Sequence, residues 1–186
     1  MRTKFYTKNG DKGKTKLGKR TLSKDHELFE FLGACDQLNS WLGIMQTSIP
    51  KKKKKVVDTV AVVNDIQNML FICMAEAAGT YFTPGKPDIR INDRHIELLE
   101  DIVARIDSCV PTIRHFVVPG GILSAAQFDY ARTLARTVER TGVTLNRKKK
   151  LAPTLLMFLN RLSSVLFALA RYENYDAKRK ERAPQY

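Results

Sequence analysis

The stretch from Tyr6 to Gly18, YTKNGDKGKTKLG, holds three glycines, two threonines and four lysines around one aspartate. Glycines let the backbone turn so that amide groups face a ligand, and lysine and threonine side chains add donors that suit phosphate oxygens. Gly13, Lys14 and Thr15 do not complete a P-loop, because that motif needs a glycine at the position that Lys8 occupies. We therefore predict a phosphate-binding loop of another kind, with a disordered basic terminus as the alternative.

The segment GACDQLNSWLG, from Gly33 to Gly43, places Asp36 and Asn39 three residues apart. Both side chains therefore share one face of an otherwise largely apolar helix. A carboxylate on such a face needs a partner that compensates its charge. The alternative is a partly exposed polar pair at the edge of the helix, and the sequence leaves both interpretations open.

A third stretch, ARTLARTVERTG, steps three arginines by four residues along one helix face: Arg132, Arg136 and Arg140. Like charges at this spacing repel one another unless an anion compensates them, and Glu139 offsets only part of the repulsion. A phosphate chain or the carboxylate of Asp36 would complete the balance, with Asn160 approaching the same face from the last helix. A solvated arginine face is the alternative.

Apolar residues at steps of three and four predict the helices that must position these side chains. The first helix begins at about residue 25, behind Ser23 as its N-cap, and stops before Pro50. Four more helices are expected over about 56–79, 92–109, 122–143 and 153–172, with proline and glycine between them. No segment alternates with period two for long enough to predict a strand.

The fold class that follows is all-α: an antiparallel five-helix bundle preceded by an N-terminal nucleotide-binding loop. With 186 residues, 44% of them hydrophobic, the chain is expected to form a single domain. This domain would comprise the loop at 1–24, the bundle at 25–172 and a basic C-terminal tail at 173–186. The last helix is apolar on nearly every side, which predicts a central position.

The formal net charge of +13 favours a polyanionic partner such as a nucleotide, a nucleic acid or an acidic membrane surface. Much of the excess lies in the runs 51–55, 147–150 and 178–182, which are typical of solvated loops and termini. A helical nucleic-acid-binding protein is the less favoured alternative, because few aromatic residues interleave with the lysines. We expect neither a nucleic-acid nor a membrane partner.

Cys35, Cys73 and Cys109 lie far apart among apolar neighbours, and we expect them to be reduced core cysteines of a cytoplasmic protein. The first residues carry no apolar stretch typical of a secretion signal, and no uninterrupted apolar run approaches the roughly 20 residues of a membrane span. The histidines form no ligand cluster, so no metal-binding side chains are predicted.

Together these stretches resemble the PduO-type ATP:cob(I)alamin adenosyltransferases, also called corrinoid adenosyltransferases. The resemblance rests on YTKNGDKGKT, SKDHELFEFLGACDQLNSWLG, FVVPGG, ARTLARTVERTG and FLNRLSSVLFALAR, and extends from Tyr6 to about Arg171. It implies a five-helix bundle that assembles as a homotrimer with active sites between subunits. It also implies transfer of the 5'-deoxyadenosyl group of ATP to the cobalt of reduced cobalamin or a related corrinoid, with Mg2+ and with triphosphate released. Reduced cobalt is itself the nucleophile, so the protein needs none of its own, and a flavin-type reductase could supply the electrons.

The resemblance also implies roles for particular residues. The ATP loop would be formed by Tyr6, Thr7, Lys8, Asn9, Gly10, Asp11, Gly13, Lys14 and Thr15, with Lys24 reaching the phosphates. The nucleotide site would be completed by Arg136, Glu139, Arg140 and Asn160. Arg132 would pair with Asp36 across the subunit interface. Phe116 would push away the lower axial ligand of cobalamin.

Three positions depart from the family pattern. Thr137 stands where a second arginine usually follows Arg136. Gln37 replaces a glutamate, and Ser164 replaces an aspartate. A catalytically weak protein of the same fold, one that delivers or senses corrinoid or ATP, is therefore the alternative function.

Overall fold

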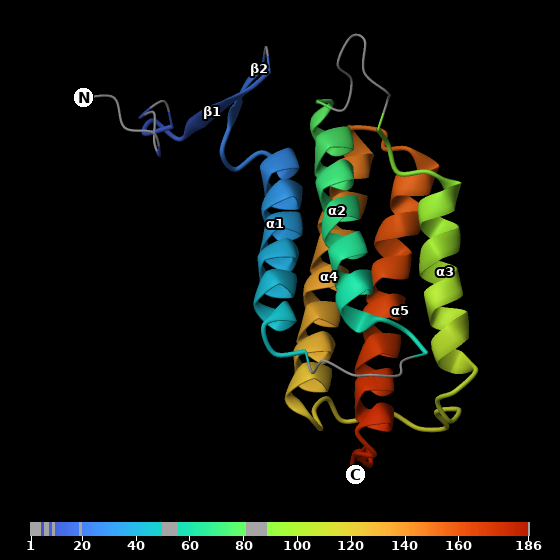
Figure 1. Cartoon of the computed structure of the whole chain (residues 1–186). Coiled ribbons are helices and arrows are strands. Elements are labelled where there is room, and N and C mark those ends of the chain that lie inside the picture. Colours follow the sequence, from blue (N-terminus) through green and yellow to red (C-terminus); the bar gives the residue numbers. More distant parts are fainter. Residues whose placement is uncertain are drawn as a thin grey trace.

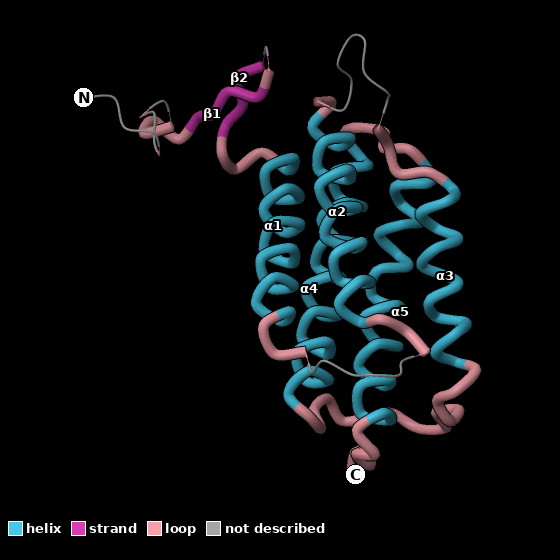
Figure 2. Tube along the Cα trace, in the orientation of Figure 1, coloured by secondary structure: helices cyan, strands magenta, loops and turns pink. Residues whose placement is uncertain are grey.

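A computed structural model describes residues 5, 8, 10–18, 20–49, 56–80 and 89–185 of the chain. Over these residues a short hairpin, β1 (Lys14–Leu17) and β2 (Arg20–Ser23), leads into five helices (Figure 1). The helices are α1 (Glu27–Gln46), α2 (Thr59–Ala78), α3 (Asp93–Asp107), α4 (Leu123–Lys148) and α5 (Pro153–Asp176). They run up and down beside one another, so the predicted antiparallel five-helix bundle is confirmed (Figure 2).

The centre of the bundle is formed by α4 and α5. Helix α5 packs against α4 and α3, and α4 packs in turn against α1. Three phenylalanines from these helices are fully buried: Phe31, Phe128 and Phe158. Helix α5 thus takes the predicted central position, because a helix that is apolar on nearly every side must be covered by others.

Two helices, α2 and α5, are long and apolar enough to cross a membrane by length and composition alone. Within the most apolar window of each helix, 44% of α2 and 56% of α5 is buried inside the protein. A core helix needs the same apolar surface as a membrane-spanning one. The bundle core therefore accounts for the composition of both helices.

The last two helices are longer than the sequence predicts. Helix α4 continues through Gly142 to Lys148, although Gly142 was expected to mark its end. A Cβ atom at Gly142 would lie 2.5 Å from Cδ1 of Leu159, so this glycine allows α4 and α5 to approach closely instead of ending a helix. Helix α5 runs to Asp176, about one turn beyond its predicted end.

The N-terminus of α1 is capped by His26, and the prediction that Ser23 caps it is wrong. The Nδ1 atom of His26 accepts a hydrogen bond from the amide of Leu28 at 3.1 Å. A second histidine, His95, closes a capping box at the start of α3, where its Nδ1 accepts from the amide of Asn92 at 3.1 Å. Both side chains thus satisfy amides that a helix start leaves without partners.

The hairpin contradicts the prediction that the chain forms no strand. Strands β1 and β2 pair antiparallel, from Lys14 opposite Ser23 to Leu17 opposite Arg20. Each strand has only four residues, so the alternation of exposed and half-buried side chains is too short to stand out in the sequence. Gly18 follows β1 with a φ of 58°, a conformation that glycine adopts without strain.

Candidate active site

The loop before the hairpin is folded by hydrogen bonds between its own backbone groups. The amide of Asp11 donates to the carbonyl of Lys8 at 3.4 Å, and the amide of Gly13 donates to that of Gly10 at 3.2 Å. The amide of Lys24 then donates to the carbonyl of Gly13 at 2.9 Å and ties the loop to the start of α1. The remaining predicted loop residues Tyr6, Thr7 and Asn9 lie outside the described residues.

Lys24 extends over the loop because Gly10 has no side chain. A Cβ atom at Gly10 would lie 2.9 Å from Nζ of Lys24. The structure therefore brings the ammonium group of Lys24 to the loop, and contact of this cation with phosphates stays a prediction. Lys14 and Thr15 are successive residues of β1, so their side chains point to opposite faces of the hairpin.

The hairpin is anchored to the end of α2 by a cation. The Nη2 atom of Arg20 donates to the carbonyl of Ala78 at 3.1 Å, and Nζ of Lys149 donates to the carbonyl of Ala77 at 2.5 Å. Both cations satisfy carbonyl groups at a helix C-terminus, where positive charge is favourable. Partial burial and the positive charge of Arg20 lower the pKa of Lys149, against an opposite effect of Glu76.

The arginine face of α4 meets α5 at one polar cluster. The Nη1 atom of Arg136 lies 3.6 Å from Oε2 of Glu139, and Oε1 of Glu139 accepts a hydrogen bond from Nδ2 of Asn160 at 3.0 Å. Asn160 thus approaches this face from α5, as the sequence predicts. Arg140 is held differently, since its Nη2 donates to Oγ1 of Thr137 at 2.9 Å.

Thr137, which departs from the family pattern, therefore has two local roles. Its hydroxyl donates to the carbonyl of Thr133 at 3.3 Å and accepts the hydrogen bond from Arg140. The threonine cannot supply a charge to a ligand, but it fixes the direction of a neighbouring arginine. This contact was not predicted, and the spacing of three residues along one helix is the signal that could have indicated it.

Asp36 and Arg132 remain apart within one copy of the chain. Asp36 is exposed on α1, whereas Nε of Arg132 is buried without a hydrogen-bond partner. No ion pair joins the two side chains in the part of the chain that the structure describes. Asn39 is buried at 6% exposure, and its Oδ1 also has no partner, so the predicted Asp36 and Asn39 pair divides into an exposed carboxylate and a buried amide.

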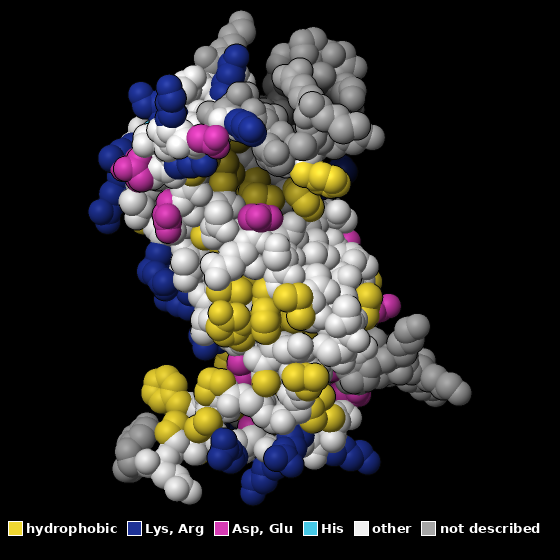
Figure 3. All heavy atoms as spheres, turned by 90° about the vertical axis from the view of Figure 1, so that its left-hand side faces the viewer, with side chains coloured by type: hydrophobic (Ala, Val, Ile, Leu, Met, Phe, Trp, Pro, Cys, Tyr) yellow, Lys and Arg dark blue, Asp and Glu magenta, His cyan; other side chains and the backbone are white. Residues whose placement is uncertain are grey.

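The surface on the α1 side of the bundle is partly apolar. Figure 3 shows groups of exposed apolar side chains on this side, with Lys and Arg at the two ends and along one edge. Exposed apolar residues of α1 and α4 include Ile44, Leu123, Tyr130 and Val143. Such groups between charged ends are typical of surfaces that contact another protein molecule.

Phe116 lies at the other end of the bundle from the hairpin. It belongs to the loop between α3 and α4, and its side chain is 79% exposed. The hairpin precedes the N-terminus of α1, which lies at the end of the bundle away from the loop between α3 and α4 (Figure 1). The two predicted parts of the site are therefore separated by the length of the bundle. Arg132, Arg136 and Arg140 lie between them on α4, with Arg136 roughly 20 Å along the helix from its start.

The other two departures are placed differently. Gln37 is exposed on α1, next to Asp36. Ser164 is exposed on α5 and lines a cavity of about 400 Å³ with residues of α3 and of the loop that follows it. Phe167 and Arg171 line the same cavity, and the guanidinium carbon of Arg171 lies 4.9 Å from the Phe167 ring centre.

The three cysteines are free; Cys35 and Cys73 are buried in the core as predicted, whereas Cys109 is only half-buried. The hydrogen bond between Cys35 and Cys73, together with burial, raises the pKa of the Cys73 thiol well above its usual range. A protonated, buried thiol is a poor nucleophile. In the described residues, no three His, Cys, Asp or Glu side chains gather closely enough to hold a metal ion.

Comparison with known proteins defines the class. Residues 5–173 match the family model described as "Cobalamin adenosyltransferase". The chain is 33% identical over 171 residues to the corrinoid adenosyltransferase of Bacillus subtilis, which covers 92% of this chain and 86% of that protein. It is 34% identical over 175 residues to the PduO corrinoid adenosyltransferase of Citrobacter freundii. That match covers 93% of this chain but only half of the longer protein.

Solved structures show the same fold. A variant PduO-type ATP:corrinoid adenosyltransferase from Lactobacillus reuteri, complexed with cobalamin and ATP, has a TM-score of 0.85 and 32% identity. The match covers 98% of this chain and 100% of that one. Another variant, complexed with ATP, has a TM-score of 0.86 and 31% identity. The chain belongs to the cobalamin adenosyltransferase family.

Proposed function

We propose that this protein transfers the 5'-deoxyadenosyl group of ATP to the cobalt of reduced cob(I)alamin or a related corrinoid. The polar cluster on α4 and α5 is the observation that carries this proposal. Arg136 is 54% exposed, and Asn160 holds the carboxylate of Glu139 beside it, so the guanidinium is available to an anionic ligand. The reaction is inferred from membership of the family, and the triphosphate of ATP is the anionic ligand.

Cationic side chains would bind the triphosphate of ATP. Lys8, Lys14 and Lys24 belong to the N-terminal loop and hairpin, and Arg136 and Arg140 belong to α4. Fixed positive charges aimed at a leaving group lower the barrier to its departure. Mg2+ would arrive with ATP, held by phosphate oxygens and water, as this ion prefers few protein ligands. Tyr6, Thr7, Asn9, Gly10, Asp11, Gly13 and Thr15 complete the proposed ATP loop.

A complete site requires more than one copy of the chain. The hairpin and Phe116 lie at opposite ends of the bundle, and neither Asp36 nor Nε of Arg132 finds its partner within the described residues of one copy. A buried guanidinium nitrogen without a partner is costly. We therefore propose a homotrimer in which Arg132 pairs with Asp36 of a neighbouring subunit and the hairpin reaches that neighbour's α4.

The reaction forms one bond and breaks another. The electron pair of Co(I) attacks C5' of ATP, a cobalt–carbon bond forms, and the C5'–oxygen bond breaks with its electron pair leaving on triphosphate. The cobalt rises formally from +1 to +3, so no side chain serves as nucleophile. Phe116 displaces the lower axial ligand, which makes the preceding reduction of Co(II) easier, and a flavin-type reductase supplies that electron. The protein works in the cytoplasm, without a nucleic-acid or membrane partner.

A direct assay tests this function. Chemically reduced cobalamin and Mg-ATP, mixed with the protein under anaerobic conditions, should yield adenosylcobalamin and triphosphate in equal amounts. The protein should also bind ATP and cob(II)alamin without turnover. A protein that binds neither substrate contradicts the proposal.

A corrinoid- or ATP-binding protein with little catalytic activity is the second candidate, favoured by Thr137. Its signature would be tight binding of both substrates without product. Turnover restored by Thr137→Arg would assign the defect to the missing cation, and turnover by the unmodified protein would exclude this candidate. Binding to nucleic acid would instead weaken steeply with added salt and would not depend on Arg136.

A further inference from the structure

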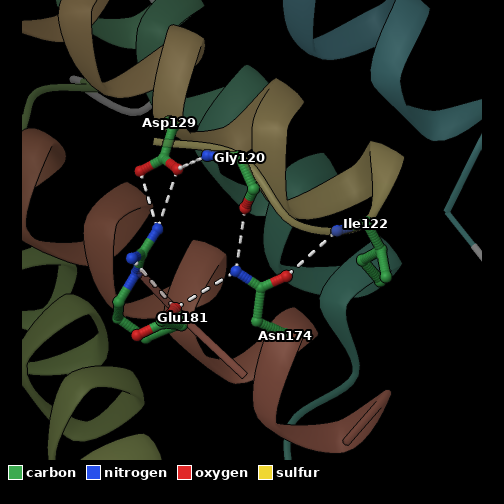
Figure 4. Close-up of polar contacts among 6 residues, drawn as sticks. Gly120, Ile122, Asp129, Asn174 and Glu181 are labelled. Carbon is green, nitrogen blue, oxygen red and sulfur yellow. Dashed lines mark hydrogen bonds and ion pairs between the residues drawn. The ribbon is translucent and has the colours of Figure 1, made fainter. Parts of the chain in front are cut away.

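The loop that carries Phe116 ends in a turn held by one buried amide side chain. Asn174 of α5 is 1% exposed; its Nδ2 donates to the carbonyl of Gly120 at 2.9 Å, and its Oδ1 accepts from the amide of Ile122 at 3.1 Å. These two contacts fix both sides of Gly121 (Figure 4). The side chain of Asn174 therefore acts as a clamp on the backbone just after Phe116.

Gly121 allows the clamp to approach. A Cβ atom at this position would lie 2.1 Å from Oδ1 of Asn174, which no real contact permits. The φ angles of Gly120 and Gly121 are 132° and 108°, in a region that side chains other than glycine rarely occupy. The close approach and the backbone conformation are thus two separate requirements for glycine at position 121.

A buried ion pair supports the same turn from α4. Asp129 and Arg171 are 4% and 3% exposed, and Nη2 of Arg171 donates to both carboxylate oxygens of Asp129 at 2.9 and 2.8 Å. The second of these oxygens also accepts from the amide of Gly120 at 3.0 Å. Charges removed from water in this way are tolerated only when their geometry is fixed. The carboxylate therefore gives the turn a rigid acceptor.

The segment after α5 completes this network. Nη1 of Arg171 forms an ion pair of 2.9 Å with Oε1 of Glu181, which also accepts from Nδ2 of Asn174 at 3.1 Å. The amide of Val118 donates to the carbonyl of Arg182 at 2.8 Å. Three points of the loop, at 118, 120 and 122, are thus tied to α4, α5 and the segment after α5.

Phe116 itself is largely exposed, so packing within the chain does little to set its position. Its position then depends on the backbone of the loop that carries it, which these contacts hold. We propose that Asp129, Asn174 and Glu181 are positioning residues that hold Phe116 where it displaces the lower axial ligand of the corrinoid. This inference rests on the proposed function and adds residues that act through Phe116 without touching the reacting atoms.

Asn174→Asp tests the clamp with little change of volume. The variant keeps an acceptor for Ile122 but loses the donor to Gly120 and places a negative charge beside Glu181. Without any ligand, hydrogen exchange at the amides of Val118, Gly120 and Ile122 should accelerate about tenfold. With ATP and cob(II)alamin, the absorption of the four-coordinate corrinoid should fall by a similar factor, while the affinity for ATP stays unchanged.

Glu181→Gln provides a milder test, because Glu181 lies at the edge of the network and its side chain is 22% exposed. It should produce the same two changes to a smaller degree without preventing folding. Glu173→Gln is the matched control. Glu173 is fully buried on the same helix, and its carboxylate accepts hydrogen bonds from the hydroxyls of Thr59 and Ser124. It should lower stability and leave loop exchange and the corrinoid spectrum intact.

The outcomes separate this inference from the proposed function. A folded Asn174→Asp protein with unchanged loop exchange and an unchanged four-coordinate signal overturns the positioning role, provided that the unmodified protein gives that signal. An unmodified protein that gives no four-coordinate signal with ATP overturns the proposed function, and the inference with it. A loss of the signal in Glu173→Gln equal to that in Asn174→Asp reduces the network to a structural role.

Discussion

The two ends of the bundle hold their functional segments by different means. At one end, the hairpin is attached by Arg20 to a helix terminus and presents exposed lysines. At the other end, the loop with Phe116 is tied by Asp129 and Asn174, which are almost fully buried. Surface charges attract a soluble anion, and salt weakens that attraction, whereas buried hydrogen bonds fix a geometry. The difference suits a flexible, charged substrate at one end and a rigid ring system at the other.

The largest effect is expected from Gly121→Ala, which breaks the buried end. The new methyl group would collide with Asn174, so the free energy of unfolding should fall by about 2–4 kcal/mol. Urea denaturation measures this change. Gly43→Ala is the control, because a Cβ atom there meets its neighbour at an ordinary 3.6 Å. Equal stability of the two variants would contradict the clamp.

Arg136→Ala removes a charge that lies between the two ends. Turnover should fall about 100-fold or more, because a cation facing the leaving triphosphate is lost, while the melting temperature changes little. Steady-state kinetics and thermal unfolding give the two values. Arg105→Ala is the control, since Arg105 is similarly exposed and forms a 3.7 Å ion pair on its own helix, and it also donates to the carbonyl of Val56. A parallel loss of turnover and stability in Arg136→Ala would give Arg136 a structural role.

Arg20→Ala tests the charged end. Loss of its hydrogen bond to the carbonyl of Ala78 should lower the free energy of unfolding by only about 1 kcal/mol. The affinity for ATP, measured by isothermal titration calorimetry, should weaken several-fold because the loop is less well placed. Arg20→Lys keeps the charge on a shorter, differently shaped donor. Weakened ATP binding in both variants assigns the effect to the bond, and normal binding in Arg20→Lys assigns it to charge.

The smallest effect concerns pH at the same anchor. The pKa of Lys149 is lowered in the folded protein, mainly by burial, so the unfolded chain binds more protons between this lowered pKa and about 10.5. Stability contributed by this group should therefore rise with pH as its folded pKa is passed. Urea denaturation at several alkaline pH values measures the slope, and Lys149→Met should remove this contribution. An identical slope in the variant would show that burial of Lys149 has no such effect.

Long helices were predictable because apolar periodicity accumulates over many residues, and α2 and α3 agree with it to within three residues at each end. The hairpin was missed because four-residue strands give little periodic signal. Gly142 was misread for a related reason. A glycine that ends a helix and a glycine that admits a neighbouring helix look the same in the sequence, and only Leu159 distinguishes them.

The geometry of the candidate site was predictable where its residues lie close along the chain. Arg136 and Glu139 are one turn apart, and the approach of Asn160 follows once α4 and α5 are antiparallel neighbours. The pairing of Asp129 with Arg171 was missed, although charged residues at buried helix positions are a signal that such a partner exists. Periodicity gives the face on which a residue lies, but not its partner 42 residues away.

The hydrogen bond between Val118 and Arg182 also sets an order of assembly. A chain made from its N-terminus could form α1 to α4 while the loop with Phe116 still lacks its support. The loop can reach its final shape only after α5 and residues 181–182 have been synthesised and have folded back. Removal of the residues after α5 should therefore leave a helical bundle that forms normally but whose loop with Phe116 is incompletely folded, because that late step depends on contacts distant in the chain.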